Sequence, residues 1–389
     1  MASARAFIEE LLKKADVKIG GDRPQDITVH DERLFNRVIR YGTLGLGEAY
    51  MDGWWDANAL DSFMTKVLTA HLEKEIKVNI ASVFTVAKAF FFNLQSSKRA
   101  FKVGEVHYDL GNDLYESMLD RRMVYTCGYW SSPSTSSGHR AMTLGEAQEA
   151  KLDLVCRKIG LKAGDRILDI GCGWGSFAKY AAEKYGASVV GITISIEQAA
   201  LARERCAGLP VEIRVQDYRE VSEQFDHIVS LGMFEHVGVK NYRTYFKMAN
   251  RCLKDNGFFL LHTIGYKKSQ LISDPWIEKY IFPGGVLPSM AQIGRATENL
   301  FIIEDVHNFG ADYDKTLMQW FKNFDTAWPK LREKYAVPFE ASAEKGRRFY
   351  RMWKYYLLSC AGVARAREMQ LWQIVLSKNG VPGGYESVR

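Results

Sequence analysis

The chain has 389 residues, more than a single ordinary core accommodates, so we expect one large domain and a smaller one. Hydrophobic residues make up 47% and charged residues 25%, which is typical of a globular chain and excludes a disordered one. The formal net charge is +6, but basic residues form no long run, so no nucleic-acid partner is indicated. The six cysteines are irregularly spaced and include no Cys-x-x-Cys pair, which favours a reduced, cytosolic protein over a disulfide framework or a metal site.

Residues 1–100 predict a small helical domain, with turns at KIGGDRPQD, RYGTLGLGEAYMDGWWD and NLQSSKRA. Its most apolar segment, 76–94, repeats apolar residues at helical spacing, although no run reaches the roughly 18 residues of a membrane-spanning helix. Two interpretations of this segment stay open. It packs inside the small domain, or it lies in a membrane interface with nearby basic residues toward anionic headgroups, namely Lys77, Lys88, Lys98, Arg99 and Lys102.

Strands and helices alternate from Gly145 onward, after a Ser-rich loop at 131–142. Five apolar runs predict strands: RILDIGC, SVVGITIS, VEIRVQD, FDHIVSLG and GFFLLHTIG. Helical patterns such as WGSFAKYAAEKYG and IEQAALARERC separate several of them. This alternation predicts an α/β fold with a doubly wound, mostly parallel sheet.

The strongest motif is LDIGCGWG at 168–175, where Gly171, Cys172 and Gly173 follow an apolar strand and open a helix. Glycine permits the tight turn and lets a ligand approach the backbone closely. Such a loop is a weak signal alone, and an NAD-binding version also needs an acid at the end of the second strand. Thr193 stands at that position here, which argues against NAD.

Two further strand ends carry polar residues suited to a nucleoside. Gln198, five residues after Thr193, is placed to bind ribose hydroxyls. The third strand ends in Gln216 and Asp217, whose carboxylate can accept from an adenine amino group while the amide lines the ring. The spacing of these three strand ends is that of S-adenosylmethionine-dependent methyltransferases, so we expect this cofactor.

Ten stretches between about residue 40 and about residue 375 are GLGEAYMDGWW, HYDLGNDLYESMLD, YTCGYW, LDIGCGWG, GITIS, GMFEHVG, LLHTIG, DPWIEKYIFPGG, HNFGADYDKTL and CAGVARAREMQLWQ. Through them the chain resembles the cyclopropane-fatty-acyl-phospholipid synthases, relatives of the mycolic acid cyclopropane synthases. HYDLGNDLY and IFPGG are far more specific than the glycine loop. One departure is the loop after Trp130, which is longer and more Ser-rich than the family pattern and leaves the domain boundary open.

This resemblance implies a helical, lipid-binding domain at 1–100, a connecting segment and cofactor lid at 101–145, and a Rossmann-like methyltransferase domain at 146–389. It implies that S-adenosylmethionine donates a methylene group to cis double bonds of unsaturated phospholipid acyl chains. The intermediate would be a carbocation, deprotonated by a bound bicarbonate ion. It also implies a cytoplasmic homodimer that contacts the inner face of the membrane peripherally.

The resemblance further assigns seven residues to the site. Tyr125 and Thr126 would approach the methionine carboxylate of the cofactor. A small anion in an apolar pocket must be hydrogen-bonded, and hydroxyl, imidazole and backbone N–H groups in the matching positions can donate to it while Glu235 accepts. The residues similar to this bicarbonate cradle are Cys127, Glu235, His262, Ile264 and Tyr313.

Other interpretations stay open. Glu235 could cap a helix, and His262 could be a buried structural histidine. A metal held by Glu235 and His236 is not expected, because adjacent residues on an extended segment point to opposite sides. Cys360 lies in an apolar helical stretch and is interpreted as core, since the reaction needs no covalent intermediate. Two other functions compete: a methyltransferase that adds a plain methyl group, and a lipid-binding module without catalysis.

Overall fold

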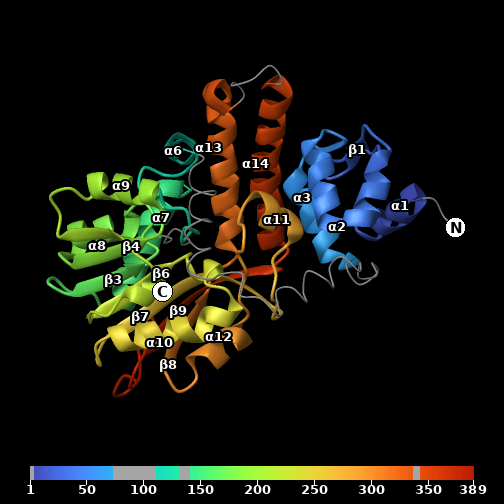
Figure 1. The fold of residues 1–389 in the computed structure, drawn as a ribbon. Helices are drawn as coiled ribbons and strands as arrows, with labels where there is room; N and C mark the ends of the chain where they lie inside the picture. Colours follow the sequence, from blue (N-terminus) through green and yellow to red (C-terminus); the bar gives the residue numbers. More distant parts are fainter. Residues whose placement is uncertain (1–3, 73–110, 131–140, 336–341) are drawn as a thin grey trace. The chain divides into compact units, whose positions relative to one another are not determined.

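The computed structural model describes residues 4–72, 111–130, 141–335 and 342–389 (Figure 1). The chain divides into two compact units that are discontinuous in sequence, unlike the contiguous domains that we expected. Unit 1 comprises Met1–Phe91, Ile272–Pro283 and Tyr313–Met369, and unit 2 comprises Phe92–Leu271, Gly284–Asp312 and Gln370–Arg389. The predicted segment 76–94 and most of the predicted loop at 131–142 lie outside the described residues.

Unit 2 is built on a mostly parallel sheet, which confirms the predicted fold class. Among the described residues the sheet has seven strands in the order β5-β4-β3-β6-β7-β9-β8. β3 pairs in parallel with β4 and β6, β4 with β5, and β6 with β7, whereas β8 is antiparallel to β9. The strands are β3 (Arg166–Ile170), β4 (Ser188–Thr193), β5 (Val211–Val215), β6 (His227–Leu231), β7 (Phe258–Tyr266), β8 (Ile302–Asn308) and β9 (Met369–Ser377).

Helices cover both faces of this sheet, because its parallel strands are apolar on both sides. Leu168 and Ile170 of β3 share a buried cluster with side chains of α10, while Ile167 shares another with side chains of α7 and α8. Successive strand residues point to opposite faces, so the two clusters form separate layers of core. The helices of this unit are α6 (Asn112–Met118), α7 (Leu144–Lys158), α8 (Ser176–Tyr185), α9 (Ile196–Arg205), α10 (Tyr242–Cys252) and α12 (Met290–Thr297).

The direction of winding changes between β3 and β6. β4 and β5 extend the sheet on one side of β3, and β6 and β7 extend it on the other. Doubly wound sheets bind ligands outside the carboxyl ends of their strands at such a point. The chain leaves β3 there through Gly171, Gly173 and Gly175, whose φ angles of 80°, 54° and 76° favour glycine over other residues.

Unit 1 is mainly helical, but it contains a two-stranded antiparallel ribbon that the sequence did not predict. The turn predicted over 40–56 is wrong for most of its length, because α2 continues to Met51. The helix breaks only at Gly42, where φ is 57° and ψ is −131°. The elements are α1 (Ala4–Lys14), β1 (Ile27–Val29), α2 (Arg33–Met51), β2 (Trp55–Ala57), α3 (Leu60–Thr69), α11 (Pro275–Tyr280), α13 (Asp312–Tyr335) and α14 (Ser342–Arg365).

Aromatic side chains form much of the core of unit 1. The ring of Tyr50 lies 5.2 Å from that of Trp55 and 5.4 Å from that of Tyr355, measured between centroids. The guanidinium of Arg351 lies 4.0 Å from the centroid of the Tyr50 ring and donates to the carbonyl of Trp55 at 2.9 Å. These contacts hold α14 against the N-terminal elements, although the two are far apart in sequence.

Gly47 of α2 leaves room for a buried indole. A Cβ at this position would stand 2.4 Å from Cδ1 of Trp276, a fully buried residue of α11. Because the indole would have to move, Gly47→Ala should lower the free energy of unfolding by about 1–3 kcal/mol.

Gly145→Ala in α7 is the matched control, since a Cβ there would meet no heavy atom within 4 Å. Alanine in a helix is more stable than glycine by about 0.5–1 kcal/mol, so this variant should melt at the same or a higher temperature. Scanning calorimetry that finds Gly47→Ala as stable as Gly145→Ala would contradict the packing of Trp276 on α2.

Candidate active site

Several loops meet at the carboxyl edge of the sheet in unit 2. The backbone N–H of Gly232, after β6, donates to the carbonyl of His262 in β7 at 2.9 Å. A Cβ on Gly232 would stand 2.5 Å from Cγ2 of Thr126, and a Cβ on Gly171 would stand 2.5 Å from Cβ of Met233. The structure therefore brings together the segments 125–127, 171–173, 232–235 and 262–264.

The glycine loop after β3 has open space beside it. A Cβ on Gly173 would meet no heavy atom within 4 Å. Cys172 is buried, and its N–H donates to the carbonyl of Ile192 at 3.0 Å. Asp169, at the end of β3, has an Oδ2 atom without a hydrogen-bond partner among the described residues. Burial raises the pKa of Asp169 to about 7, and the nearby positive charge of Lys151 opposes that rise.

The predicted nucleoside residues lie at the ends of β4 and β5. The hydroxyl of Thr193 donates to Oε1 of Gln198 at 3.0 Å, and the N–H of Gln216 donates to the carbonyl of Thr193 at 3.0 Å. The carboxylate of Asp217 accepts from the backbone and the guanidinium of Arg219, at 2.9 and 2.8 Å. A carboxylate has about four acceptor positions, so this ion pair leaves capacity for a further donor. Their contacts with ribose and adenine stay a prediction.

Glu235 lies on the short 3-10 helix η3 (Phe234–His236), which follows β6. Its Oε1 accepts from the N–H of Ile264 at 2.7 Å, whereas we expected that N–H to donate to a bound anion. Oε2 has no partner among the described residues, and the side chain caps none of the helices that follow. Burial raises the pKa of Glu235 to about 7, while the Ile264 N–H opposes the rise. Near neutral pH this carboxyl group can therefore accept or release a proton.

His262 is buried in β7 and is neutral. Its pKa lies well below the usual value, first because of burial and then because of the positive charges of Lys151 and Lys158. The amide of Gln373 lies 3.4 Å from Nδ1 and donates to it as the amide is oriented, which leaves the ring proton on Nε2. Nε2 has no partner among the described residues, so it is a donor without an acceptor. The ring of Phe309 lies 5.9 Å away, between centroids.

Cys127 and Tyr125 flank Thr126 on the same segment. Cys127 is fully buried, and its thiol contacts the carbonyl of Gly128 at 3.2 Å. The ring of Tyr125 packs edge-on against that of Tyr115, with centroids 5.3 Å apart. A small thiol and an aromatic ring thus line this side of the carboxyl edge.

The other residues considered from the sequence have different environments. Burial lowers the pKa of His236 to about 4, so it is neutral beside Glu235. Burial raises the pKa of Cys360 to about 12, which leaves it a thiol, but the residue is only partly buried and is not the core residue that we expected. Tyr313 belongs to unit 1, where it is buried in α13 with its ring 6.0 Å from that of Trp320. Within the described ranges, no three or more His, Cys, Asp or Glu side chains are grouped to hold a metal ion.

Comparison with known proteins decides the family. The family described as mycolic acid cyclopropane synthetase matches residues 95–374, most of the chain. The chain belongs to this family. It is 53% identical over 380 residues to the cyclopropane-fatty-acyl-phospholipid synthase of Escherichia coli strain K12, an alignment that covers 98% of this chain and 94% of that protein.

Two other similar proteins share less of this sequence. The crystal structure of mycolic acid cyclopropane synthase CmaA1 complexed with SAH and CTAB superposes with a TM-score of 0.62 at 31% identity, over 72% of this chain and 98% of that one. The tuberculostearic acid methyltransferase UfaA1 of Mycobacterium tuberculosis is 30% identical over 375 residues, or 92% of this chain and 85% of that protein.

Two residues of the present chain that contact the segment 124–126 were not predicted from its sequence. Gln148 and Lys151 of α7 are both fully buried, which is rare for polar side chains of this length. They lie three positions apart, so they share one face of the helix. Their burial could have been predicted from helical spacing, because Gln148 and Lys151 fall on the same side of α7 as the apolar residues Leu144, Leu152 and Val155.

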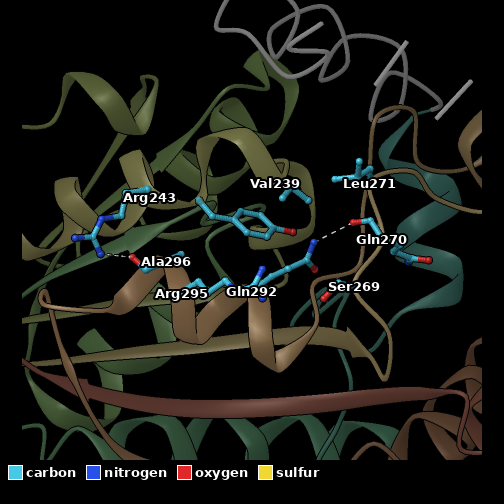
Figure 2. Close-up of a pocket in the computed structure, with 9 residues that line it drawn as sticks. Val239, Arg243, Ser269, Gln270, Leu271, Gln292, Arg295 and Ala296 are labelled. Carbon is cyan, nitrogen blue, oxygen red and sulfur yellow. Dashed lines mark hydrogen bonds between the residues drawn. The ribbon is translucent and has the colours of Figure 1, made fainter. Parts of the chain in front are cut away.

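A separate cavity of about 500 Å³ lies among α10, α12 and the segment 269–271 of unit 2 (Figure 2). None of the predicted site residues line it. Figure 2 shows the amide of Gln292 turned toward the carbonyl of Gln270, to which it donates at 3.0 Å. The guanidinium of Arg243 donates to the carbonyl of Ala296 at 2.9 Å. The hydroxyl of Tyr242 also lines the cavity and has no partner among the described residues, but none of the residues assigned to the cofactor or the anion does, so we assign the cavity no part in the site.

Proposed function

We propose that this chain is an S-adenosylmethionine-dependent cyclopropane-fatty-acyl-phospholipid synthase, which converts cis double bonds of phospholipid acyl chains into cyclopropanes. Its 53% identity to the Escherichia coli protein of that name, over 98% of the chain, carries the proposal. The carboxyl edge of the sheet agrees with it, because Glu235 and His262 each have a buried polar atom without a partner among the described residues. Such atoms need a ligand or water to satisfy them.

The described residues fit the cofactor. The space beside Gly173 is open, and the unpartnered Oδ2 of Asp169 lies at the base of the same loop. When bound, S-adenosylmethionine supplies an electrophilic methyl group on a positively charged sulfur. We assign its methionine part to Tyr125, Thr126 and the loop Gly171, Cys172 and Gly173, its ribose to Thr193 and Gln198, and its adenine to Gln216 and Asp217.

The proposed base is a bicarbonate ion held beside Glu235. The neutral ring of His262 carries its proton on Nε2 and can donate to an anion, while Cys127 provides a small wall. Glu235 holds its Oε1 against Ile264 and has Oε2 available to share a proton with the ion. Sharing a proton lets two acidic groups lie together without repulsion, and a pKa of about 7 for Glu235 suits this near neutral pH. Tyr313, which the resemblance adds to this cradle, belongs to unit 1, and its role stays a prediction.

Plain methyl addition is the second candidate, favoured by the 30% identity to a tuberculostearic acid methyltransferase. Both reactions begin with attack of the alkene on the methyl group, and they differ in the fate of the resulting cation. Ring closure requires that a proton leave the transferred methyl group. Ring closure is favoured here because the site has buried groups that can hold the base that removes this proton. These groups are Glu235, which accepts from the N–H of Ile264, and the neutral ring of His262.

Incubation of the full chain with vesicles of unsaturated phospholipid and methyl-labelled S-adenosylmethionine tests the proposal. We expect NMR of the recovered lipid to show the ring protons of a cyclopropane while the alkene signal falls. A branched methyl signal in their place would support the second candidate. Absence of label from the lipid would contradict both.

We further infer that the chain reaches the bilayer peripherally, as a homodimer. No helix in the described part of the chain is long and apolar enough to cross a membrane. Each basic residue near an anionic surface contributes about 1 kcal/mol, and salt screens the attraction over about 10 Å at about 0.1 M.

Neutralising the basic residues near 76–94 should therefore weaken binding to anionic vesicles. The five are Lys77, Lys88, Lys98, Arg99 and Lys102, each replaced by glutamine.

The control for this prediction carries the same change of net charge at exposed positions far from 76–102 in the sequence. It replaces five exposed lysines by glutamine: Lys162, Lys184, Lys240, Lys247 and Lys254. Co-sedimentation of the full chain with vesicles, at two salt concentrations, compares the variants. If the two quintuple variants sediment equally, the proposal that the segment around 76–94 docks to the membrane would be contradicted.

A further inference from the structure

Lys151 is a fully buried cation that contacts the proposed cofactor segment. Its Nζ donates to Oγ1 of Thr126 at 2.6 Å. Gln148, on the same face of α7, donates from its amide to the carbonyl of Thr126 at 2.8 Å. Gln148 therefore already ties this segment to α7, and a second tie would not need a charge. Burying an ammonium group is costly unless an opposite charge compensates it, so Lys151 requires a further explanation.

The carboxylates near Lys151 are Asp169 and Asp120, and both attract its charge. The oxygens of Asp120 already accept from the backbone N–H groups of Arg122 and Val124, at 3.1 and 3.0 Å. Burial lowers the pKa of Lys151 to about 8 and raises that of Asp169 to about 7, with each opposing the shift of the other. The cation therefore lies among acids that are themselves poorly solvated, and its short hydrogen bond goes to a neutral hydroxyl.

This hydrogen bond determines what the Thr126 hydroxyl can do. An ammonium group has donors and no acceptor, so Oγ1 must accept from Lys151. The single hydroxyl hydrogen is then directed away from Lys151. The Thr126 methyl group is fixed as well, because Cγ2 lies against the backbone of Gly232, 2.5 Å from where a Cβ would stand. Thr126 is thus oriented as a donor at the edge of the sheet where the other site loops meet.

We propose that Lys151 is a positioning residue of the cofactor site, which makes Thr126 a hydrogen-bond donor to the carboxylate of S-adenosylmethionine. That carboxylate also supplies negative charge near the buried ammonium group. The inference rests on the proposed function, in which Thr126 faces the methionine part of the cofactor. Lys151 itself acts through Thr126 and is not assigned to the reacting atoms.

The test compares two ligands that differ by one carboxylate. S-adenosylhomocysteine has the carboxylate, and its decarboxylated analogue keeps the adenosine, the sulfur and the amino group. Hydrogen bonds to charged groups change affinity by about 10- to 100-fold, so Lys151→Met and Thr126→Val should each weaken S-adenosylhomocysteine binding by about that factor. Neither should change the affinity for the decarboxylated analogue. The double variant should bind no more weakly than Thr126→Val alone.

Two controls separate positioning from folding. Lys158→Met removes another buried lysine of α7, which contacts His307 and Asp305 at 3.1 and 3.7 Å and does not contact Thr126. It should leave both affinities unchanged. Thr126→Ser keeps the hydroxyl that accepts from Lys151 and should bind S-adenosylhomocysteine more tightly than Thr126→Val does. Equal weakening of both ligands by Lys151→Met, or no weakening, would overturn the inference.

If Lys151→Met does not fold, NMR of the ammonium group of Lys151 in folded protein tests the inference in its place. Lys151 and Lys158 are the buried lysines of the described residues, so in lysine labelled with ¹⁵N the one of their two ammonium signals that survives in Lys158→Met belongs to Lys151. It should shift when S-adenosylhomocysteine binds and stay in place with the decarboxylated analogue, and an identical response to both ligands would overturn the inference. If the parent chain binds no S-adenosylhomocysteine at all, the proposed function itself fails.

Discussion

Replacing Glu235 by glutamine should lower turnover by about 100-fold or more, the effect expected when a group that handles a proton is lost. Affinity for S-adenosylhomocysteine should stay the same. The amide oxygen can still accept from the N–H of Ile264, which lies 2.7 Å from Oε1, so the local fold should be kept. An uncharged amide cannot share a proton with a bound anion. Steady-state kinetics and calorimetric titration on one preparation separate the two quantities.

Glu204→Gln is the matched control for this substitution, because Glu204 is exposed on α9 of the same unit. Its turnover should equal that of the parent chain. Added bicarbonate should raise the rate of carbonate-depleted parent chain and leave Glu235→Gln unchanged. Full activity of the parent chain in rigorously carbonate-free buffer would contradict the bicarbonate and favour Glu235 itself as the base.

The glutamine variant should also change how stability depends on pH. Burial raises the pKa of Glu235 to about 7 in the folded chain, above its unfolded value of about 4.3. Its contribution to stability is therefore complete below the unfolded pKa and is lost as pH rises through about 7. Because glutamine does not ionise, Glu235→Gln should lose less melting temperature than the parent chain between about pH 4.5 and about pH 7, the range between the unfolded and folded pKa values of the carboxyl group. Parallel melting curves would contradict the buried position of this carboxyl group.

Substitution of Gly173 by valine should abolish cofactor binding, with affinity for S-adenosylhomocysteine reduced by about 100-fold or more. The open space beside this residue is where we place the cofactor, and a branched side chain would enter it. Valine would also be strained there, because φ at Gly173 is 54°. The measurement is again calorimetric titration, with circular dichroism to check the fold.

Gly164→Val is the control that separates backbone strain at a positive φ from steric blocking of the cofactor site. Gly164 also has a positive φ, 87°, and a Cβ there would meet no heavy atom within 4 Å. It lies in the turn before β3, at the opposite end of that strand from the glycine loop. Both variants should lose stability, and only Gly173→Val should lose the ligand. Unchanged affinity of folded Gly173→Val would remove the loop from the cofactor site.

The five parallel strands of the unit 2 sheet were predictable because their local signals agree with one another, whereas the antiparallel pair β8 and β9 was not predicted. In β3, for example, apolar residues follow one another, and Leu168 and Ile167 alternate between two buried layers. Gly171 and Gly186 lie at positive φ where the chain turns, so each glycine marks a real boundary. Such agreement between pattern and turn chemistry leaves little for tertiary contacts to override.

Unit 1 was less predictable, because distant parts of the chain stabilise it. Its ribbon strands have only three residues each, too short for an alternating pattern to show. α2 continues through a glycine-rich stretch because Gly47 is needed against Trp276, a residue more than two hundred positions away. A sequence window around Gly47 reads as a turn, since the indole that explains the glycine is outside it.

In the site, residue types were predictable and hydrogen-bond partners were not. The motifs pointed to Glu235 and Ile264 separately, but a backbone N–H carries no sequence signal, so their pairing was missed. Lys151 was missed because lysine in a helix is usually exposed. Only the structure shows that it is buried against Thr126.

Cofactor carrying a trideuteriomethyl group tests the central claim most directly. The full chain is incubated with vesicles of unsaturated phospholipid, and the acyl products are analysed by mass spectrometry. Ring closure requires loss of one hydrogen from the transferred methyl group, so the account predicts products that keep two of its three deuterium atoms. Products that keep all three would contradict it, because the transferred methyl group would then have remained intact and no cyclopropane could have formed from it.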